Sequence, residues 1–299
     1  MTGGLKFLER DIIEYRREST RIKHVAAEYL RLSDAEKTKT LILAGTNRER
    51  ELLTDSIRAG LRAEGKLGAS AILKTLEPKD LTREELLVTA KLAPGDVLAF
   101  HKSFPRQGIR KGEQVEIVSV NHAERVITTR RQSGERLDVF PSKTPGFKAF
   151  TVKDREFATF DKVRWTQNDK ILGLRNGQDL LVEQISKDSI TLTTKAGKRV
   201  ELSTEARLQL DHSYVNTVYS SQGKTAERVL ISTDKTFGKE AMYVAVTRAK
   251  SGVTLYTEDK ERMLGFANIS RAKVSAVELV PEQSHQQAIV RSHRHSMGR

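Results

Sequence analysis

An internal repeat between residues 94 and 204 constrains the fold of this chain more than any other feature of the sequence. Residues 108–112 (G-I-R-K-G) match residues 173–177 (G-L-R-N-G), and further matches follow in each copy. Short runs rich in β-formers alternate with glycine-containing turns throughout the region, a pattern typical of small barrels. We therefore expect two tandem small β-barrels, joined by a connector over residues 140–150.

The sequence on either side of the repeat has the pattern of an α/β layer. Residues 40–44 predict a buried strand, and helical spacing follows over residues 49–64. The apolar run at 229–231 predicts a second buried strand, and residues 252–257 predict a third. Apolar residues at intervals of three and four predict a helix over residues 5–32.

Two polar segments flank the predicted strand at 229–231. The first is T-V-Y-S-S-Q-G-K-T at residues 217–225, and the second is Y-V-A-V-T-R-A-K at residues 243–250. Ligands of such sheets bind outside the carboxyl ends of the strands, and a Gln-Gly turn with an arginine suits a ligand that carries phosphate. A guanidinium on a helix can neutralise the charge that develops on a γ-phosphate. We therefore expect both segments at the ends of neighbouring elements, beside such a ligand.

These segments resemble motifs V and VI of superfamily 1 DNA helicases, most closely in the RecD-like helicase part of conjugative relaxases of the TraI/TrwC type. Family members have T-V-H-x-x-Q-G-x-T followed by Y-V-A-x-T-R-A. The resemblance implies that Gln222, Gly223 and Thr225 bind ATP and couple it to DNA, and that Arg248 is the catalytic arginine finger. A plain turn with a solvated arginine is the alternative. The occurrence of both segments in this order and spacing favours the helicase interpretation.

The resemblance also implies contacts with DNA. Thr217 and Tyr219 belong to the first motif, where many members have histidine in place of Tyr219. The strand, loop and helix around Thr46, Asn47 and Arg48 resemble motif IV, whose loop contacts nucleotide or a DNA phosphate. An ordinary helix cap with solvated arginines explains the loop equally well.

The predicted barrels carry basic residues that suit the backbone of a single strand. Arg110 and Arg175 occupy matching turns of the two copies, and we expect them to bind DNA. Phe100 and Trp165 also match, and we expect both in the barrel cores, because equivalent positions more often share packing than ligand.

The fold we expect is α/β, namely the second RecA-like domain of a helicase interrupted by two tandem SH3-like β-barrels. The expected organisation is a helical lead-in with the first part of the RecA-like domain at 1–92, SH3-like barrels at 93–146 and 147–205, the second part of the RecA-like domain at 206–266, and a tail or linker at 267–299.

No Walker A or Walker B segment is visible in the sequence. Residues 60–67 have the glycine and lysine spacing of a Walker loop, but Leu67 stands where a hydroxyl would hold Mg²⁺. The chain is therefore expected to need the N-terminal RecA-like domain of a larger parent to bind ATP and Mg²⁺, and not to hydrolyse ATP alone.

Charge and composition indicate the class of partner. The net charge of +13 and the pI near 9.8 favour a polyanion, most simply nucleic acid. Zero cysteines exclude disulfides and thiolate metal sites, and we expect no metal. With neither a signal peptide nor an apolar stretch of membrane-spanning length, the expected location is the cytoplasm, without membrane insertion.

The predicted function is the C-terminal half of an ATP-dependent helicase or translocase of a conjugative relaxase that binds single-stranded DNA. A non-catalytic module that binds single-stranded DNA and carries a type IV secretion signal, recognised by the coupling protein, is the alternative. A pair of RNA-binding barrels is a third interpretation, but it leaves both helicase-like motifs unexplained.

Overall fold

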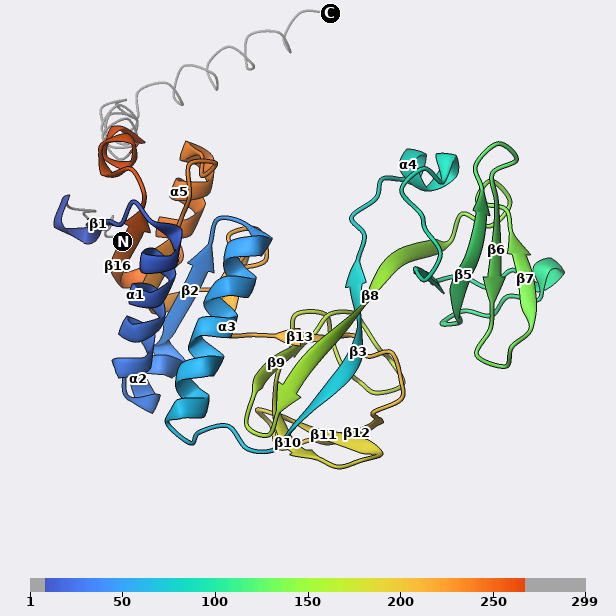
Figure 1. Cartoon of the computed structure of the whole chain (residues 1–299), viewed down its shortest axis with the longest axis horizontal. Coiled ribbons are helices and arrows are strands. Elements are labelled where there is room, and N and C mark those ends of the chain that lie inside the picture. Colours follow the sequence, from blue (N-terminus) through green and yellow to red (C-terminus); the bar gives the residue numbers. More distant parts are fainter. Residues whose placement is uncertain (1–8, 267–299) are drawn as a thin grey trace, which may run out of the picture. The chain divides into compact units, whose positions relative to one another are not determined.

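The computed structural model describes residues 9–266 and divides into two compact units (Figure 1). The α/β unit contains the described residues up to Ala63 and those from Tyr214 onward, whereas the β unit is Glu64–Ser213. The β unit is therefore an insertion in the α/β unit. The predicted tail at 267–299 lies outside the described residues.

The α/β unit contains one parallel five-stranded sheet in the order β1-β16-β15-β2-β14. Its elements are η1 (Glu9–Asp11), β1 (Ile12–Glu14), α1 (Glu18–Arg31), α2 (Asp34–Lys39), β2 (Thr40–Ala44), α3 (Asn47–Ala63), β14 (Val215–Thr217), β15 (Ala226–Ser232), α5 (Lys239–Val246) and β16 (Ala249–Thr257). The three strands predicted at 40–44, 229–231 and 252–257 are all present.

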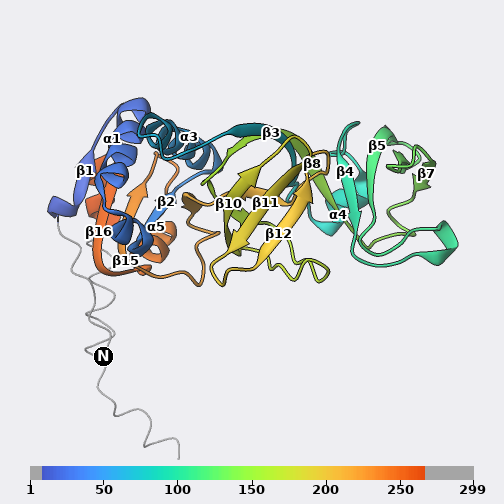
Figure 2. The same ribbon diagram turned by 90° about the horizontal axis from the view of Figure 1, so that it is seen from below.

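Alternation along the strands assigns the helices to the two faces of this sheet. Ile231 of β15 packs in one core cluster with Met242 and Ala245 of α5. The next residue, Ser232, points to the other face, where it bonds to side chains of α1 and α3. Helices α1 and α3 thus cover one face and α5 the other, as Figure 2 shows. The sheet is buried on both sides, which explains its continuous apolar strands.

The predicted helix over 5–32 is wrong for residues 12–17, and its residues 5–8 lie outside the described residues. Ile12–Glu14 form β1, which pairs in parallel with β16 so that Ile12 is opposite Leu255. Ile12 is only 2% exposed. Burial beside a partner far away in the sequence overrides the local helical spacing, and the helix begins only at Glu18.

The β unit contains two antiparallel sheets in the orders β3-β8-β4-β5-β6-β7 and β12-β11-β10-β9-β13. Its elements are β3 (Ser70–Pro78), α4 (Arg83–Val88), β4 (Val97–Phe100), η2 (Pro105–Gln107), β5 (Gln114–Asn121), β6 (Val126–Arg130), β7 (Arg136–Val139), β8 (Phe147–Ala158), β9 (Lys162–Trp165), β10 (Asp179–Ile185), β11 (Ser189–Thr194), β12 (Arg199–Ser203) and β13 (Leu210–His212).

The sequence repeat is also a repeat of structure. The first repeat is β4 to β7 with the start of β8, and the second is β9 to β12 with β13; the strand orders 8-4-5-6-7 and 13-9-10-11-12 correspond. Each repeat has a register shift at the same place, after Ile117 and after Val182. The matching turn residues Gly108 and Gly173 both have φ of +65°, a left-handed conformation that favours glycine.

Each repeat has its own apolar core. Phe100 lies in one core cluster and Trp165 in the other, at 2% and 3% exposure, which confirms that both residues are buried. The predicted closed barrels were not found: within the described residues, the two outer strands of each repeat are not hydrogen-bonded to each other. In the described part of the chain, β7 and β12 are therefore edge strands of open sheets.

The division into units differs from the expected boundaries at 92 and 205. Strand β3 pairs with β8 along its whole length, so the β unit already begins at Glu64. Strand β13 pairs with β9, and the chain returns to the parallel sheet only at β14. Both strands are joined to the β unit by long-range pairing that their own sequences do not reveal.

Candidate nucleotide and nucleic-acid site

The loops after β2 and β14 lie side by side at the carboxyl edge of the parallel sheet. Ala44 and Thr217, the last residues of these strands, are register partners. Thr46 caps α3, because its Oγ1 accepts a hydrogen bond from the Glu49 backbone N–H at 3.2 Å. Asn47 is exposed, and Tyr219 is 91% exposed. Four of the predicted DNA-binding residues, Thr46, Asn47, Thr217 and Tyr219, therefore share one edge.

Arg48 is exposed on the same edge but is already paired. Its guanidinium donates to both carboxylate oxygens of Glu18 on α1, one of them at 2.9 Å. These hydrogen bonds and the charge of Glu18 raise the pKa of Arg48. A DNA phosphate at this position would compete with Glu18.

Beneath the carboxyl edge lies a buried polar network that sequence reasoning missed. Arg21 of α1 donates from Nε and Nη2 to Glu49 Oε1, both at 3.1 Å, and Ser232 donates to the same oxygen at 2.6 Å. The other oxygen of Glu49 accepts from the Gly45 backbone N–H at 3.3 Å. The network thus ties α1, α3 and the ends of β2 and β15 together, and it holds the Thr46 loop in place.

The C-terminal ends of the two predicted motifs, 217–225 and 243–250, meet at the amino edge of the sheet. Ala226, which follows the segment 217–225, donates its backbone N–H to the carbonyl of Arg248 at 2.9 Å. Gly223 has φ of +84°, and Gln222 and Thr225 are exposed beside it. The end of the first segment and Arg248 are therefore joined at this edge through Ala226, and a joint role of the Gln-Gly turn and the arginine stays a prediction.

The sequence predicts a ligand crevice at the carboxyl ends of the strands. For the stretch 222–225 and Arg248, that expectation is wrong. Strands β15 and β16 begin at Ala226 and Ala249, so Gln222 to Thr225 and Arg248 lie where the strands start. Parallel strands must all begin at one edge, so the chain that leaves β14 at Thr217 has to cross back before it enters β15. The seven residues of β15 separate the two edges by roughly 20 Å.

The Arg248 side chain has no hydrogen-bond or ion-pair partner within residues 9–266. Its Nε is buried without a hydrogen bond, and no ion pair to its guanidinium occurs among residues 9–266. The residue as a whole is partly exposed. A buried donor without a partner costs free energy that an anionic ligand can recover. An anion could satisfy this nitrogen, and contact of Arg248 with a ligand stays a prediction.

Arg110 and Arg175 lie in the β unit at matching turns. The backbone N–H of Arg110 donates to Glu113, and that of Arg175 donates to Gln178 at the equivalent place. Both side chains are exposed. The structure thus confirms that the two arginines are equivalent and accessible, and their contact with DNA stays a prediction.

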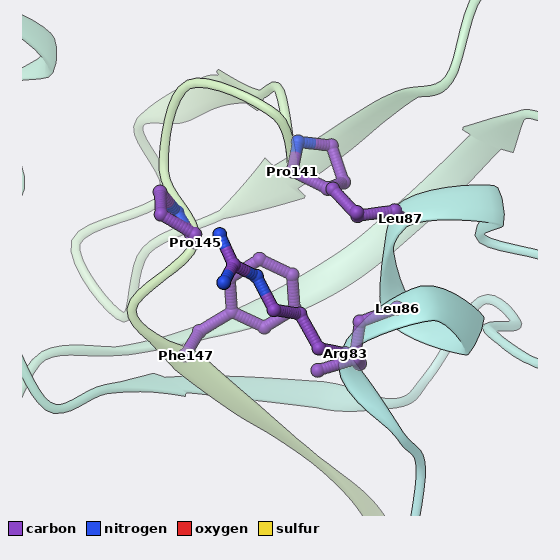
Figure 3. Close-up of a pocket in the computed structure, with 6 residues that line it drawn as sticks. All are labelled: Arg83, Leu86, Leu87, Pro141, Pro145 and Phe147. Atoms are coloured by element: carbon purple, nitrogen blue, oxygen red, sulfur yellow. The ribbon is translucent and has the colours of Figure 1, made fainter.

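A small apolar pocket occurs elsewhere in the β unit, between α4 and the segment that leads into β8 (Figure 3). Its lining is Arg83, Leu86, Leu87, Pro141, Pro145 and Phe147. None of the predicted site residues lines it. Within residues 9–266 there is no group of three or more His, Cys, Asp or Glu side chains that could hold a metal ion, and no helix long and apolar enough to cross a membrane.

Comparison with known proteins now adds independent information. A model of the viral superfamily 1 RNA helicase core domain matches residues 151–257, from within β8 to the end of β16. The multifunctional conjugation protein TraI of Escherichia coli is 26% identical over 254 residues, which are 79% of this chain and 14% of TraI. The conjugal transfer protein TraA of Rhizobium radiobacter is 32% identical over 106 residues, which are 34% of this chain and 10% of TraA.

Solved structures with some similarity are Pif1 helicases. Pif1 from Bacteroides in complex with ADP-AlF3 and single-stranded DNA has 13% identity and a TM-score of 0.26, covering 90% of this chain and 56% of that one. Pif1 from Candida albicans has 14% identity and a TM-score of 0.27, covering 83% and 55%.

The parallel sheet and the sequence matches together support a region like that of superfamily 1 helicases. Within that class the region is TraI-like, since the match to TraI covers 79% of the chain. The chain spans only about a tenth to a seventh of the length of the conjugation proteins it matches.

Proposed function

We propose that this chain is the C-terminal RecA-like half of an ATP-dependent, single-stranded DNA translocase within a conjugative relaxase. The observation that carries the proposal is the backbone hydrogen bond from Ala226, which directly follows the segment with Gln222 and Gly223, to Arg248 at the amino edge of the sheet. The Arg248 guanidinium has no ion pair among residues 9–266.

In this proposal ATP and Mg²⁺ are bound by the N-terminal RecA-like domain of the parent, and Arg248 reaches the γ-phosphate from this half. The buried Nε without a partner fits a phosphate oxygen as acceptor. Phosphoryl transfer depends on positioning and on stabilising charge, and an arginine finger contributes about 10³ to 10⁵ in turnover. Arg248 holds a charge at the transferring phosphoryl group and moves no proton.

Single-stranded DNA would bind at the carboxyl edge through Thr46, Asn47, Arg48, Thr217 and Tyr219. Tyr219 offers a ring that is 91% exposed, and bases stack on such rings. Arg110 and Arg175 would track the backbone on the β unit. For Arg48, DNA binding requires exchange of Glu18 for a phosphate.

In this proposal, the segment 218–225 links DNA binding at the carboxyl edge to the nucleotide site at the amino edge. It begins at the carboxyl edge, beside Thr217, and ends at the amino edge, where Ala226 bonds to the Arg248 backbone. A shift of Tyr219 on DNA binding would be transmitted through one short stretch of chain to Gln222 and Gly223. This arrangement supports a coupling role for Gln222, Gly223 and Thr225.

We further propose that the two repeats are open relatives of SH3-like barrels. Each repeat is a four-stranded meander with a fifth strand that pairs beside its first, and the equal register shifts and separate cores also support that class. Contact of this region with a type IV secretion coupling protein, and a cytoplasmic location, follow from the family resemblance.

The test is DNA-stimulated ATP hydrolysis by the parent protein carrying Arg248→Ala. We expect turnover to fall by about 10³ or more while affinity for single-stranded DNA changes little. Lys250→Ala is the matched control, because Lys250 is an exposed cation two positions on that lies 3.6 Å from Glu227. Turnover at the wild-type rate in Arg248→Ala would refute the arginine-finger role. A wild-type parent that binds DNA without hydrolysing ATP would favour the non-catalytic module.

A further inference from the structure

The two repeats share a backbone but differ in charge on one surface. In the first repeat, the backbone N–H of His101 donates to Gly146 at 2.8 Å; in the second, Thr166 donates to Gln209 at 2.9 Å. Lys111 N–H donates to the Ser103 side chain at 3.0 Å, just as Asn176 N–H donates to the Asn168 side chain at 2.9 Å. The same scaffold is therefore present twice, down to single hydrogen bonds.

On this scaffold the first repeat gathers a cation cluster, which we define as Lys102, Lys111 and Lys148 around His101. These residues come from three separate stretches: the end of β4, the turn before β5 and the start of β8. All are exposed. The backbone brings these stretches together: Lys111 bonds to the side chain of Ser103, the neighbour of Lys102, and Lys148 is opposite Ala99 in the pairing of β4 with β8. Partial burial, and then the charges of Lys102, Lys148 and Lys111, lower the pKa of His101. None of the three lysines has an ion pair among residues 9–266.

The second repeat has lost this charge at every corresponding position. The matched hydrogen bonds and strand pairings show which positions of the two repeats correspond. His101, Lys102 and Lys111 of the first repeat correspond to Thr166, Gln167 and Asn176 of the second. Lys148 is opposite Ala99, and its counterpart Asp211 is opposite Arg164.

Asp211 is moreover bound to Arg155 and Arg164. The second repeat therefore forms the same strands and backbone hydrogen bonds without lysines at these positions.

Three unpaired like charges held together are unfavourable in the free protein, and an anion relieves that repulsion. Exposed lysines on a rigid sheet end, each able to rotate three donors toward an oxygen, suit phosphate oxygens better than a single fixed carboxylate. We propose that the cation cluster of the first repeat is a binding site for the phosphodiester backbone of single-stranded DNA, and that the second repeat lacks an equivalent site. This inference rests on the proposed function, because it takes single-stranded DNA to be the ligand.

The experiment measures binding of a fluorescein-labelled oligothymidylate to the full chain by anisotropy over a salt series. The test variant is Lys102→Gln/Lys111→Asn/Lys148→Gln, which gives the first two positions the residues of the second repeat. The matched control is Lys74→Gln/Lys187→Gln/Lys195→Gln, which removes the same charge from the surface of the β unit outside the cluster. All substituted lysines are exposed or half-exposed, and equal thermal melting of the variants checks folding.

We expect the cluster variant to lose at least about tenfold in affinity at low salt. The slope of log affinity against log salt concentration should also become shallower by about 2, since each phosphate contact with a single strand contributes roughly 0.7. The control should change the slope by much less. The reciprocal variant Gln167→Lys/Asn176→Lys should bind more tightly than wild type, because it builds part of the cluster on the second repeat.

The outcomes separate this inference from the proposed function. If the wild-type chain binds DNA and the cluster variant matches the control, the cluster is not a DNA site, while DNA binding by the chain stands. If the wild-type chain does not bind DNA at low salt, both fall. Displacement of the oligonucleotide by inorganic phosphate, or equal affinity for polyglutamate of the same charge, would show a general anion site and would overturn the assignment to DNA.

Discussion

Two buried or half-buried arginines mark the opposite edges of the parallel sheet, and they have opposite surroundings. Arg21, beneath the carboxyl edge, is fully buried and shares Glu49 with Ser232. Arg248, at the amino edge, has a buried Nε with no partner and no ion pair within the described residues. The difference teaches that the charge of an arginine does not define its role. Arg21 also has one buried nitrogen without a hydrogen bond, Nη1, but its Nε and Nη2 are bonded to the Glu49 carboxylate. A guanidinium with a buried counter-ion ties elements of the fold together, whereas one with no counter-ion in the described residues can take an anionic ligand.

The largest expected effect tests the structural side of this contrast. Glu49→Leu leaves the charge of Arg21 buried without its counter-ion, and we expect the free energy of unfolding to fall by about 3 to 5 kcal/mol in chemical denaturation. The double variant Arg21→Met/Glu49→Leu should recover most of that loss, because it buries no charge at all. A loss below about 1 kcal/mol in the single variant would mean that the network does not hold the carboxyl edge.

A smaller effect is expected at the turn of the amino edge. Gly223 has φ of +84° and open space around its α-carbon, so a side chain there meets backbone strain but no clash. We expect Gly223→Ala to lower the free energy of unfolding by about 1 kcal/mol, and Gly223→Asn to cost less, since asparagine tolerates this conformation better. Equal melting temperatures for the alanine and asparagine variants would argue against a strained turn.

The smallest expected change in the free energy of unfolding is that of Arg248→Ala, and it tests the contrast between Arg21 and Arg248 most directly. Arg248→Ala removes no protein hydrogen bond and no ion pair among residues 9–266, so we expect the free energy of unfolding to change by less than about 0.5 kcal/mol. Denaturation of this variant beside Glu49→Leu provides the measurement. A loss as large as that of the Glu49 variant would place Arg248 with the structural arginines and weaken the proposed role in catalysis.

Local sequence patterns predicted the elements well where the signal lay within a short stretch. The strand at Thr40–Ala44 has the predicted bounds, and the repeat appears as equal strand orders and equal turn conformations. The segment 217–225 is followed by Ala226, whose backbone bonds to Arg248, and the roles of both motifs stay predictions. In these cases the residues that determine the structure are neighbours in the chain or copies of one another.

What the sequence did not reveal depends on contacts between distant positions. Strand β1 exists because Ile12 pairs beside Leu255, and no local pattern contains that partner. The edge of the sheet at which Arg248 lies follows from the direction in which β15 enters the sheet. Arg21 and Ser232 are 211 positions apart, so their shared hydrogen bonds leave no periodic signal.

The insertion of the β unit between β2 and β14 has a consequence for how the chain folds. During synthesis, β2 emerges long before β14 and β15, the two strands that flank it in the finished sheet. The β unit has its own apolar cores and can form first, while β2 waits with both backbone edges unpaired. Sheets closed by such distant strands form slowly, and exposed apolar edges invite aggregation in the interval. Refolding of the whole chain should therefore be slower, and more dependent on protein concentration, than its many short hairpins would suggest.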